Sequence, residues 1–173
     1  MITAPKNCFM NQKISFRTEV REDDCKTVRK ILESTGFFHD FEVDVAVSLV
    51  EEALQQGENS GYYFVFAEDN GITTGYSCFG DIPCTRNSYD IYWIAVSQDQ
   101  RGKGTGGLLL KETERLIGEK KGNGIYLETS STEKYLPTRN FYLKYGYVIE
   151  AVIRDFYDYG DDKVLFVKRL NPS

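Results

Sequence analysis

The first third of the chain shows two hydrophobic periods, which predict one strand followed by two helices. Apolar and polar residues alternate over residues 14–18, as in a half-buried strand. The acidic cluster at residues 22–24 suits the N-terminus of a helix, and that helix should stop near Gly36. A second helix is expected over residues 43–56, closed by Gly57. One face of this second helix is formed at helical spacing by Val43, Val47, Val50 and Leu54.

Strands dominate the middle of the chain, over residues 62–67, 73–79 and 89–96. The connections between these strands are short, which favours an antiparallel meander. Helical spacing returns over residues 104–121, with apolar side chains on one side and charged side chains on the other. The pattern then predicts a buried strand at 125–128, a short helix ending near 145, and strands near 148–153 and 163–168.

The resulting order of elements is β-α-α-β-β-β-α-β-α-β-β, which indicates one domain of the α/β (α+β) class. We assign residues 14–170 to this domain and residues 1–13 to a loose N-terminus. A chain of 173 residues is long enough to bury around two-thirds of its unfolded surface in a single core.

Composition narrows the classes of function. The 41% apolar content includes no run near the roughly 20 residues that cross a bilayer, and residues 1–13 lack the features of a secretory signal. A net charge of −5 argues against a broad nucleic-acid surface. Four cysteines without a C-x-x-C pair, and a single histidine, do not match the usual zinc spacings. We therefore expect a cytoplasmic protein with no metal and with neither a membrane nor a nucleic acid as partner.

A glycine-rich turn over residues 102–106 joins an apolar strand to an amphipathic helix. Glycine permits a tight turn, and the first turn of a helix leaves N–H groups unpaired at the positive end of the helix dipole. Such a turn is typical of a site that binds phosphate groups.

A dinucleotide is one alternative for the ligand of this turn, because Gly102, Gly104 and Gly107 satisfy G-x-G-x-x-G and Glu128 stands where a ribose-binding acid is expected. The spacing argues against it, since residues 97–101 separate the strand from the first glycine. The antiparallel strands before the turn also differ from the parallel strands of a dinucleotide fold. A Walker A loop is excluded, because no Lys-Ser or Lys-Thr pair follows a glycine at the required spacing.

Two motifs resemble signatures of the GNAT superfamily of N-acetyltransferases. The first is Arg101-x-x-Gly104-x-Gly106, which opens a helix after an apolar strand and resembles the acyl-coenzyme A motif of the family. The second is the segment 138–147, which contains an aromatic-Tyr-x-x-x-Gly-aromatic run. The resemblance implies the GNAT fold, a single mixed, largely antiparallel sheet of about seven strands flanked by about four helices.

The resemblance also implies acetyl-coenzyme A (acetyl-CoA) as co-substrate. Backbone N–H groups of residues 102–106 would surround the pyrophosphate, and the end of the preceding strand would pair with the pantetheine arm. The implied cofactor-binding residues are Ile94, Ala95, Val96, Arg101, Gly102, Lys103, Gly104, Thr105, Gly106 and Asn140. Asn140 is included because Tyr135 stands where many family members carry a coenzyme-binding Asn, although a helix-surface role is equally open. The alternatives for the 3′-phosphate are Lys103, Arg139 and Lys144.

Catalysis in the family is direct transfer within a ternary complex, which needs an acid and a base. Tyr142 matches the family tyrosine beside the coenzyme sulfur and is the predicted general acid. Asp90 stands where several members carry a glutamate base, and Glu128 or water are alternatives. We expect Asp90 to share a strand face with Tyr92 and Ile94, by the two-residue period.

The acceptor is expected to lie beside two loops, residues 37–40 and residues 155–162. The second loop is acidic and aromatic, which suits a cationic amine, but the same residues are also typical of a solvated turn. We predict an acyltransferase that moves acetyl from acetyl-CoA to a primary amine, either a small molecule or a protein N-terminus. The alternatives are a non-catalytic CoA-binding regulatory module and, less favoured, an NAD-dependent oxidoreductase. The oligomeric state is left open by the sequence, with a homodimer as one alternative because the family often forms dimers.

Overall fold

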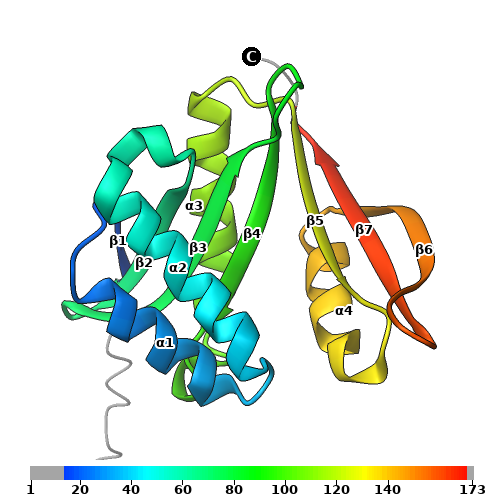
Figure 1. The fold of residues 1–173 in the computed structure, drawn as a ribbon, viewed down its shortest axis with the longest axis horizontal. Coiled ribbons are helices and arrows are strands. Elements are labelled where there is room, and N and C mark those ends of the chain that lie inside the picture. The colour runs from blue at the N-terminus through cyan, green and yellow to red at the C-terminus, as the bar shows by residue number, and fades with distance from the viewer. Residues whose placement is uncertain (1–13, 171–173) are drawn as a thin grey trace, which may run out of the picture.

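Seven strands form one sheet in the order β1-β2-β3-β4-β5-β7-β6, with helices on both of its faces (Figure 1). The computed structural model describes residues 14–170, so the predicted loose terminus at residues 1–13 lies outside the described residues. The strands are β1 (Ile14–Arg17), β2 (Tyr63–Asp69), β3 (Ile72–Asp81), β4 (Ser88–Val96), β5 (Gly124–Ser130), β6 (Val148–Asp158) and β7 (Asp161–Arg169). The helices are α1 (Asp24–Thr35), α2 (Asp40–Gln56), α3 (Thr105–Glu119) and α4 (Leu136–Lys144).

The predicted order of elements and the mixed sheet are confirmed. Neighbouring strands run antiparallel except β4 and β5, which are parallel. α2 begins at Asp40 rather than at residue 43. The reason is that the backbone N–H of His39 donates to the carboxylate of Glu42 at 2.8 Å, which closes the first turn of the helix.

The exposure of Leu54 and the end of β6 differ from what the hydrophobic pattern predicts. Leu54 was expected on the buried face of α2 but is 37% exposed. The buried stripe there passes through Val50 and Ala53, so Leu54, the next residue around the helix, lies at its edge. β6 continues to Asp158 rather than ending near residue 153, which leaves a turn of only two residues before β7.

Each face of the sheet carries its own hydrophobic core. On one face α3 and α4 contribute Leu109 and Tyr142, which pack with Phe166 of β7. On the other face α1 and α2 contribute Leu32 and Val50, and this second core contains no residue of β5, β6 or β7 among those described. α1 and α2 therefore cover only the β2–β4 half of their face, as Figure 1 shows. No helix within residues 14–170 has the length and apolar character needed to span a membrane.

A β-bulge in β4 changes which side chains share a face. The register of β4 with β3 shifts by one residue at Tyr92. Ile91 and Ile94 consequently both face the core of α3, although three residues separate them. Asp90, next to Ile91, lies on the opposite face from Ile94. The expectation that Asp90 and Ile94 share a face is therefore wrong, because the bulge interrupts the two-residue period.

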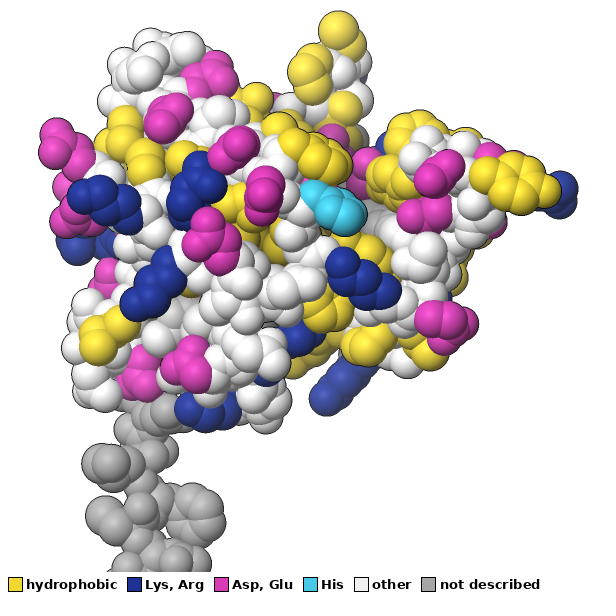
Figure 2. Space-filling model, turned by 60° about the horizontal axis from the view of Figure 1, so that its bottom comes forward, with side chains coloured by type: hydrophobic (Ala, Val, Ile, Leu, Met, Phe, Trp, Pro, Cys, Tyr) yellow, Lys and Arg dark blue, Asp and Glu magenta, His cyan; other side chains and the backbone are white. Residues whose placement is uncertain are grey.

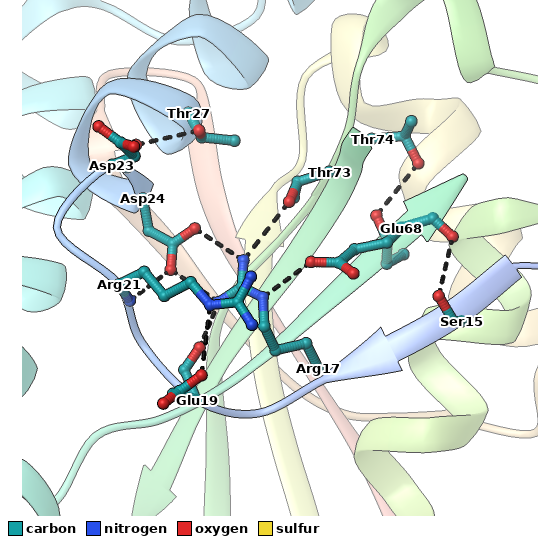
Figure 3. A network of polar contacts seen from close by, with 11 residues as sticks. Ser15, Arg17, Glu19, Arg21, Asp23, Asp24, Thr27, Glu68, Thr73 and Thr74 are labelled. Carbon is teal, nitrogen blue, oxygen red and sulfur yellow. Dashed lines mark hydrogen bonds and ion pairs between the residues drawn. The ribbon is translucent and has the colours of Figure 1, made fainter. Parts of the chain in front are cut away.

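A guanidinium with little exposure joins β1 to α1 and β2 (Figure 3). Two nitrogens of Arg17 donate to the two carboxylate oxygens of Asp24, each at 2.9 Å, and a third donates to Glu68 at 2.8 Å. The exposed fractions of these side chains are 10% for Arg17, 4% for Asp24 and 17% for Glu68. Burial opposes the charge, but the two carboxylates raise the pKa of Arg17. This network fixes the edge strand β1 against the start of α1.

Replacing Arg17 by Ala should lower the free energy of unfolding by about 3 kcal/mol, because it leaves two largely buried carboxylates without a cation. Urea unfolding followed by circular dichroism measures the change. Arg21→Ala is the matched control: Arg21 and its partner Glu19 are 58% and 74% exposed, and loss of that pair should cost less than about 1 kcal/mol. Equal losses in the two variants would show that burial does not govern the strength of the network.

Candidate active site

β4 and β5 separate after a short paired stretch and leave a wedge-shaped opening in the sheet (Figure 1). Their pairing is confined to three residues of each strand, from Ser88 opposite Gly124 to Asp90 opposite Tyr126. Among the described residues, the rest of β4, from Ile91 to Val96, has a strand partner only on its β3 side. An unpaired strand edge of this kind offers backbone hydrogen bonds to an extended ligand.

The ladder between β3 and β4 decides which residues offer those bonds. The N–H of Ser97 donates to the carbonyl of Thr74 at 2.8 Å, so Ser97 directs its N–H towards β3. The backbone N–H and C=O groups of successive residues in an antiparallel strand point to opposite sides. Those of Ile94 and Val96 therefore point away from β3 and towards the opening. Of the three strand residues expected to bind cofactor, Ala95 differs from the other two, because its backbone groups point towards β3, where it is paired with Tyr76.

The glycine turn that follows β4 presents unpaired backbone donors. Gly102 and Gly104 have φ values of 78° and 89°, which glycine adopts without strain. α3 begins at Thr105 with Gly104 as its N-cap and with no side-chain cap. Within the part of the chain that the structure describes, the N–H groups of Gly102, Gly104, Thr105 and Gly106 have no acceptor. Four free donors at the positive end of a helix form an anion site.

Two predicted residues of this turn are engaged within it. The N–H of Lys103 donates to the carbonyl of Gln100 at 3.4 Å, so it is not free like its neighbours. The side chain of Arg101 donates to Gln98 at 3.1 Å, and its guanidinium lies 4.8 Å from the ring centroid of Phe37. The free donors of the turn are thus those of the glycines and Thr105.

The end of α4 packs against the first turn of α3 at a position where any side chain would displace the phenol of Tyr145. A Cβ atom on Gly107 would lie 1.7 Å from the hydroxyl oxygen of Tyr145. A Cβ atom on Gly106 would lie 3.8 Å from the ring of Phe141, which is ordinary contact. These contacts hold α4, and with it Tyr142, beside the anion site.

Tyr142 lies in the core with an unpartnered hydroxyl. Its ring centroid is 5.5 Å from that of Phe166 and 5.8 Å from that of Tyr147. The residue is 6% exposed, and no hydrogen bond to its hydroxyl exists within residues 14–170. Burial raises the pKa of Tyr142 above that of a free phenol. The hydroxyl therefore stays protonated at neutral pH and can donate to a bound ligand.

Asp90, Glu128 and Lys163 interact on the sheet face opposite α3 and α4. The ammonium nitrogen of Lys163 lies 2.5 Å from one oxygen of Glu128, and the hydroxyl of Tyr157 donates to the other at 3.3 Å. Asp90 is half-buried and, as far as the structure describes the chain, forms no hydrogen bond or ion pair. Burial and the charge of Glu128 raise the pKa of Asp90, while Lys163 acts against them. Of the two candidate bases, Asp90 is thus the one with free oxygens.

The acidic residues of the segment 155–162 mainly build its turn. Asp155 accepts the N–H of Gly160 at 2.7 Å, and Asp162 accepts the N–H of Asp155 at 3.0 Å. Asp161 accepts the hydroxyl of Ser130 at 2.6 Å, which ties the turn to the end of β5. The solvated-turn reading fits these three carboxylates, whereas Tyr157 of the same segment reaches Glu128.

The connection between α1 and α2 touches both sides of the opening through Phe37. The ring of Phe37 meets that of Tyr135, just before α4, edge-on at 5.7 Å. Lys134 donates to the carbonyl of Phe37, and Arg101 of the glycine turn stacks on its ring. Figure 2 shows hydrophobic side chains gathered between the helical half of the molecule and the half that carries β6 and β7.

The remaining predicted residues lie on or near α4. Asn140 is exposed and has no partner within the described chain. Arg139 donates to the carbonyls of Ser130 and Thr132, both at 2.8 Å, so part of its guanidinium holds the segment after β5. Lys103 and Lys144 are exposed.

Lys163 is the member of the site that the sequence pattern missed. It stands opposite Ser130 in the β5–β7 ladder, two positions from the pair formed by Glu128 and Leu165. No local motif marks this lysine, because a long-range strand register alone brings it to Glu128.

Comparison with known proteins identifies the family. Residues 59–149, which include the glycine turn and Tyr142, match the family model described as an acetyltransferase (GNAT) domain. The chain belongs to the GNAT acetyltransferase family. The predicted fold and enzyme class are thereby confirmed, although no curated protein sequence matches this GNAT chain.

Solved structures agree with this assignment. A crystal structure from Desulfovibrio desulfuricans, of a protein ascribed to the GNAT family, is 42% identical, covers 91% of this chain and 99% of its own, and superposes with a TM-score of 0.89. The yncA protein of Salmonella typhimurium, solved with its cofactor acetyl-CoA, is 17% identical over 93% of this chain and 96% of its own, with a TM-score of 0.72. The paia N-acetyltransferase of Thermoplasma acidophilum, in complex with coenzyme A, is 17% identical over 91% and 99%, with a TM-score of 0.69. The last two share the fold of this chain.

Gly107→Ala should lower the free energy of unfolding of this GNAT chain by about 1–3 kcal/mol, because the new methyl group overlaps the Tyr145 phenol. Gly118→Ala on the same helix is the matched control. No atom lies within 4 Å of its Cβ position, and alanine there should stabilise the helix by up to about 1 kcal/mol. Thermal and urea unfolding measure both variants, and equal stability of the two would contradict the packing described for α3 and α4.

Proposed function

We propose that this GNAT acetyltransferase moves the acetyl group of acetyl-CoA to a primary amine, by direct attack in a ternary complex. One observation carries the proposal: the free N–H groups at the start of α3 follow the edge of β4 that β5 leaves unpaired, and the hydroxyl of Tyr142 in α4 has no partner among the described residues. Such an arrangement combines an anion site, a strand edge and a proton donor. The acceptor is a small-molecule amine or a protein N-terminus.

The residues of the opening fit acetyl-CoA. The donors of Gly102, Gly104, Thr105 and Gly106 would bind the pyrophosphate, each bond to the anion contributing about 1.5–3 kcal/mol. The edge of β4 at Ile94 and Val96 would pair with the pantetheine arm. Two structures of the same fold were solved with acetyl-CoA or coenzyme A, which supports the choice of ligand. Acetyl-CoA supplies the activated thioester carbon for the transfer.

Proton transfers in the reaction fall to two side chains. An amine that is protonated in solution must lose a proton before it attacks, and Asp90, with free oxygens and a raised pKa, suits that role. A new C–N bond forms as the C–S bond breaks, and the departing thiolate takes the proton of the Tyr142 hydroxyl. A backbone N–H at Ile94 or Val96 would donate to the carbonyl oxygen as it gains charge.

The charges around Asp90 favour a cationic acceptor. Two carboxylates, Asp90 and Glu128, share this part of the sheet with one cation, Lys163, which leaves a net negative charge. The ring of Tyr157 lies beside them through its hydrogen bond to Glu128, and the pKa of Tyr92 is raised to about 12 by burial and by Asp90. An ammonium group is the ligand that such an acidic and aromatic setting prefers.

An acceptor screen tests the proposed activity. A thermal-shift titration with acetyl-CoA and with NAD establishes the ligand, and release of free thiol is then followed over small primary amines and over peptides with free N-termini. We expect stabilisation by acetyl-CoA alone and turnover with cationic amines. Binding of acetyl-CoA without turnover of any amine would favour the non-catalytic module, and binding of NAD alone would revive the oxidoreductase.

Tyr142→Phe should lower kcat at least about tenfold and leave the affinity for coenzyme A nearly unchanged, because the variant keeps the ring but loses the proton. Steady-state kinetics and calorimetry measure the two quantities. Tyr63→Phe, at a partly buried tyrosine of β2 that has no role in the proposed mechanism, is the matched control and should retain its kcat. An unaltered kcat in Tyr142→Phe would remove Tyr142 from the mechanism.

Asp90→Asn should abolish the acidic limb of the pH profile of kcat/KM. The base acts when it is ionised, so activity rises as pH passes its pKa, and this pKa is raised above that of an ordinary carboxyl. Asp44→Asn, at an exposed residue of α2 paired with Arg29, is the control and should keep the limb. Superimposable profiles of Asp90→Asn and the parent protein would assign the proton to water or to Glu128, which a parallel Glu128→Gln profile distinguishes.

A further inference from the structure

A cation with little exposure joins β7 to α3 and to the end of α4. The ammonium nitrogen of Lys168, near the end of β7, donates to a carboxylate oxygen of Glu114 in α3 at 2.8 Å. The same nitrogen donates to the backbone carbonyl of Tyr145, just after α4, at 2.9 Å. The side chains of Lys168 and Glu114 are 25% and 13% exposed, so water and salt screen this ion pair less than a pair on the surface.

The end of α4 is held to α3 at two points. Lys168 binds the carbonyl of Tyr145, where a positive charge stabilises the negative end of the helix dipole. Because Glu114 holds the ammonium group of Lys168, this bond ties the end of α4 to α3 as well as to β7. The second point is the phenol of Tyr145, which lies against Gly107 of α3.

Tyr147 connects this cation to the ring of Tyr142. The ammonium nitrogen of Lys168 lies 5.5 Å from the ring centroid of Tyr147, and that ring lies 5.8 Å from the ring of Tyr142. The N–H of Tyr147 also donates to the carbonyl of Tyr142 at 3.1 Å. Tyr147 is 1% exposed, and burial and the charge of Glu114 both raise its pKa. Lys168 therefore reaches Tyr142 by two routes, the end of α4 and the packed ring of Tyr147.

We infer that Lys168, held by Glu114, is a positioning residue that orients the hydroxyl of Tyr142 towards the departing thiolate. This inference rests on the proposed role of Tyr142 as the general acid. Within residues 14–170 no hydrogen bond fixes the Tyr142 hydroxyl, so the end of α4 and the packing around the ring decide where its proton lies. A displacement of about 1 Å in a catalytic group can lower a rate by up to about a hundredfold.

A double-mutant cycle tests this inference. Lys168→Met keeps an apolar stem but removes the ammonium group, and it should lower kcat about fivefold or more while the Kd for coenzyme A stays within about twofold of the parent value. In the Tyr142→Phe background the same change should lower kcat by less than about twofold, because the group that Lys168 positions is already absent. Lys168→Arg keeps a cation and should retain most of the parent kcat.

Two controls separate positioning from stability. Arg115→Met removes a cation from ion pairs with Glu112 and Glu119 on α3, and it should leave kcat unchanged. Arg17→Ala weakens the fold at the edge strand β1 and should keep its kcat at temperatures where circular dichroism shows the variant to be folded.

Nuclear magnetic resonance of the protein labelled with carbon-13 in its tyrosine rings gives a readout that needs no turnover. The signal of Tyr142 is the one that Tyr142→Phe removes. It should shift in Lys168→Met and keep its place in Arg115→Met.

A fall in kcat that disappears in the Tyr142→Phe background, together with a shifted Tyr142 signal, supports the inference. An unaltered kcat in Lys168→Met, equal falls in both backgrounds, an unmoved Tyr142 signal, or a kcat of Lys168→Arg as low as that of Lys168→Met would overturn it. Failure of the proposed function shows separately, as an unaltered kcat in Tyr142→Phe alone or no turnover of any amine, and the inference then fails with it. If Lys168→Met does not fold, Glu114→Gln, which removes the charge of the partner but keeps its shape, replaces it under the same criteria.

Discussion

The loss of pairing between β4 and β5 is the constraint on which the rest of the site depends. A parallel pair normally continues for the length of its strands, yet here it ends at Asp90 and Tyr126. The bulge at Tyr92 lies just beyond that point and turns the following residues, so that Ile94 faces α3 while Asp90 faces away. The inserted residue thus places the side chains of Asp90 and Ile94 on opposite faces of the sheet. The backbone donors of β4 lie along one side of the opening, and the carboxylate of Asp90 lies where the pairing of β4 with β5 ends.

Helix packing sets the distance between the anion site and the proton donor. α3 carries the free N–H groups in its first turn, and α4 carries Tyr142. The Tyr145 phenol fits against the start of α3 because Gly107 has no side chain where that phenol lies. The same core holds the ring of Tyr142 between Tyr147 and Phe166. Rigid packing of this kind orients a hydroxyl without any hydrogen bond of its own, which leaves that hydroxyl free for a ligand.

Glu128 and Asp90, the two carboxylates on the sheet face opposite α3 and α4, differ in their electrostatic surroundings. Glu128 is held by Lys163 and Tyr157, so its oxygens are occupied. Asp90 has no such partners and is half-buried, and both its burial and its neighbour Glu128 raise its pKa. Two acids of similar chemistry thereby differ in availability, because the strand register gives one of them a cation and leaves the other free.

The sequence by itself determined the order of elements, the glycine turn and the motif around Tyr142, because each of these depends on neighbours a few residues apart in the chain. Helical and strand periods, the φ values that glycine permits and the free donors at a helix start are local properties. The periodic pattern did not predict the start of α2, because the hydrogen bond from the His39 N–H to Glu42 sets it. Nor did it predict the exposure of Leu54, which lies at the edge of the buried stripe of α2. Only the tertiary structure decided that Asp90 and Ile94 lie on opposite faces, that Lys163 reaches Glu128 and that Gly107 admits Tyr145. These relations join residues that are distant in sequence or follow from a bulge, and the free energies that fix them come from strand register and core packing, which no local pattern encodes.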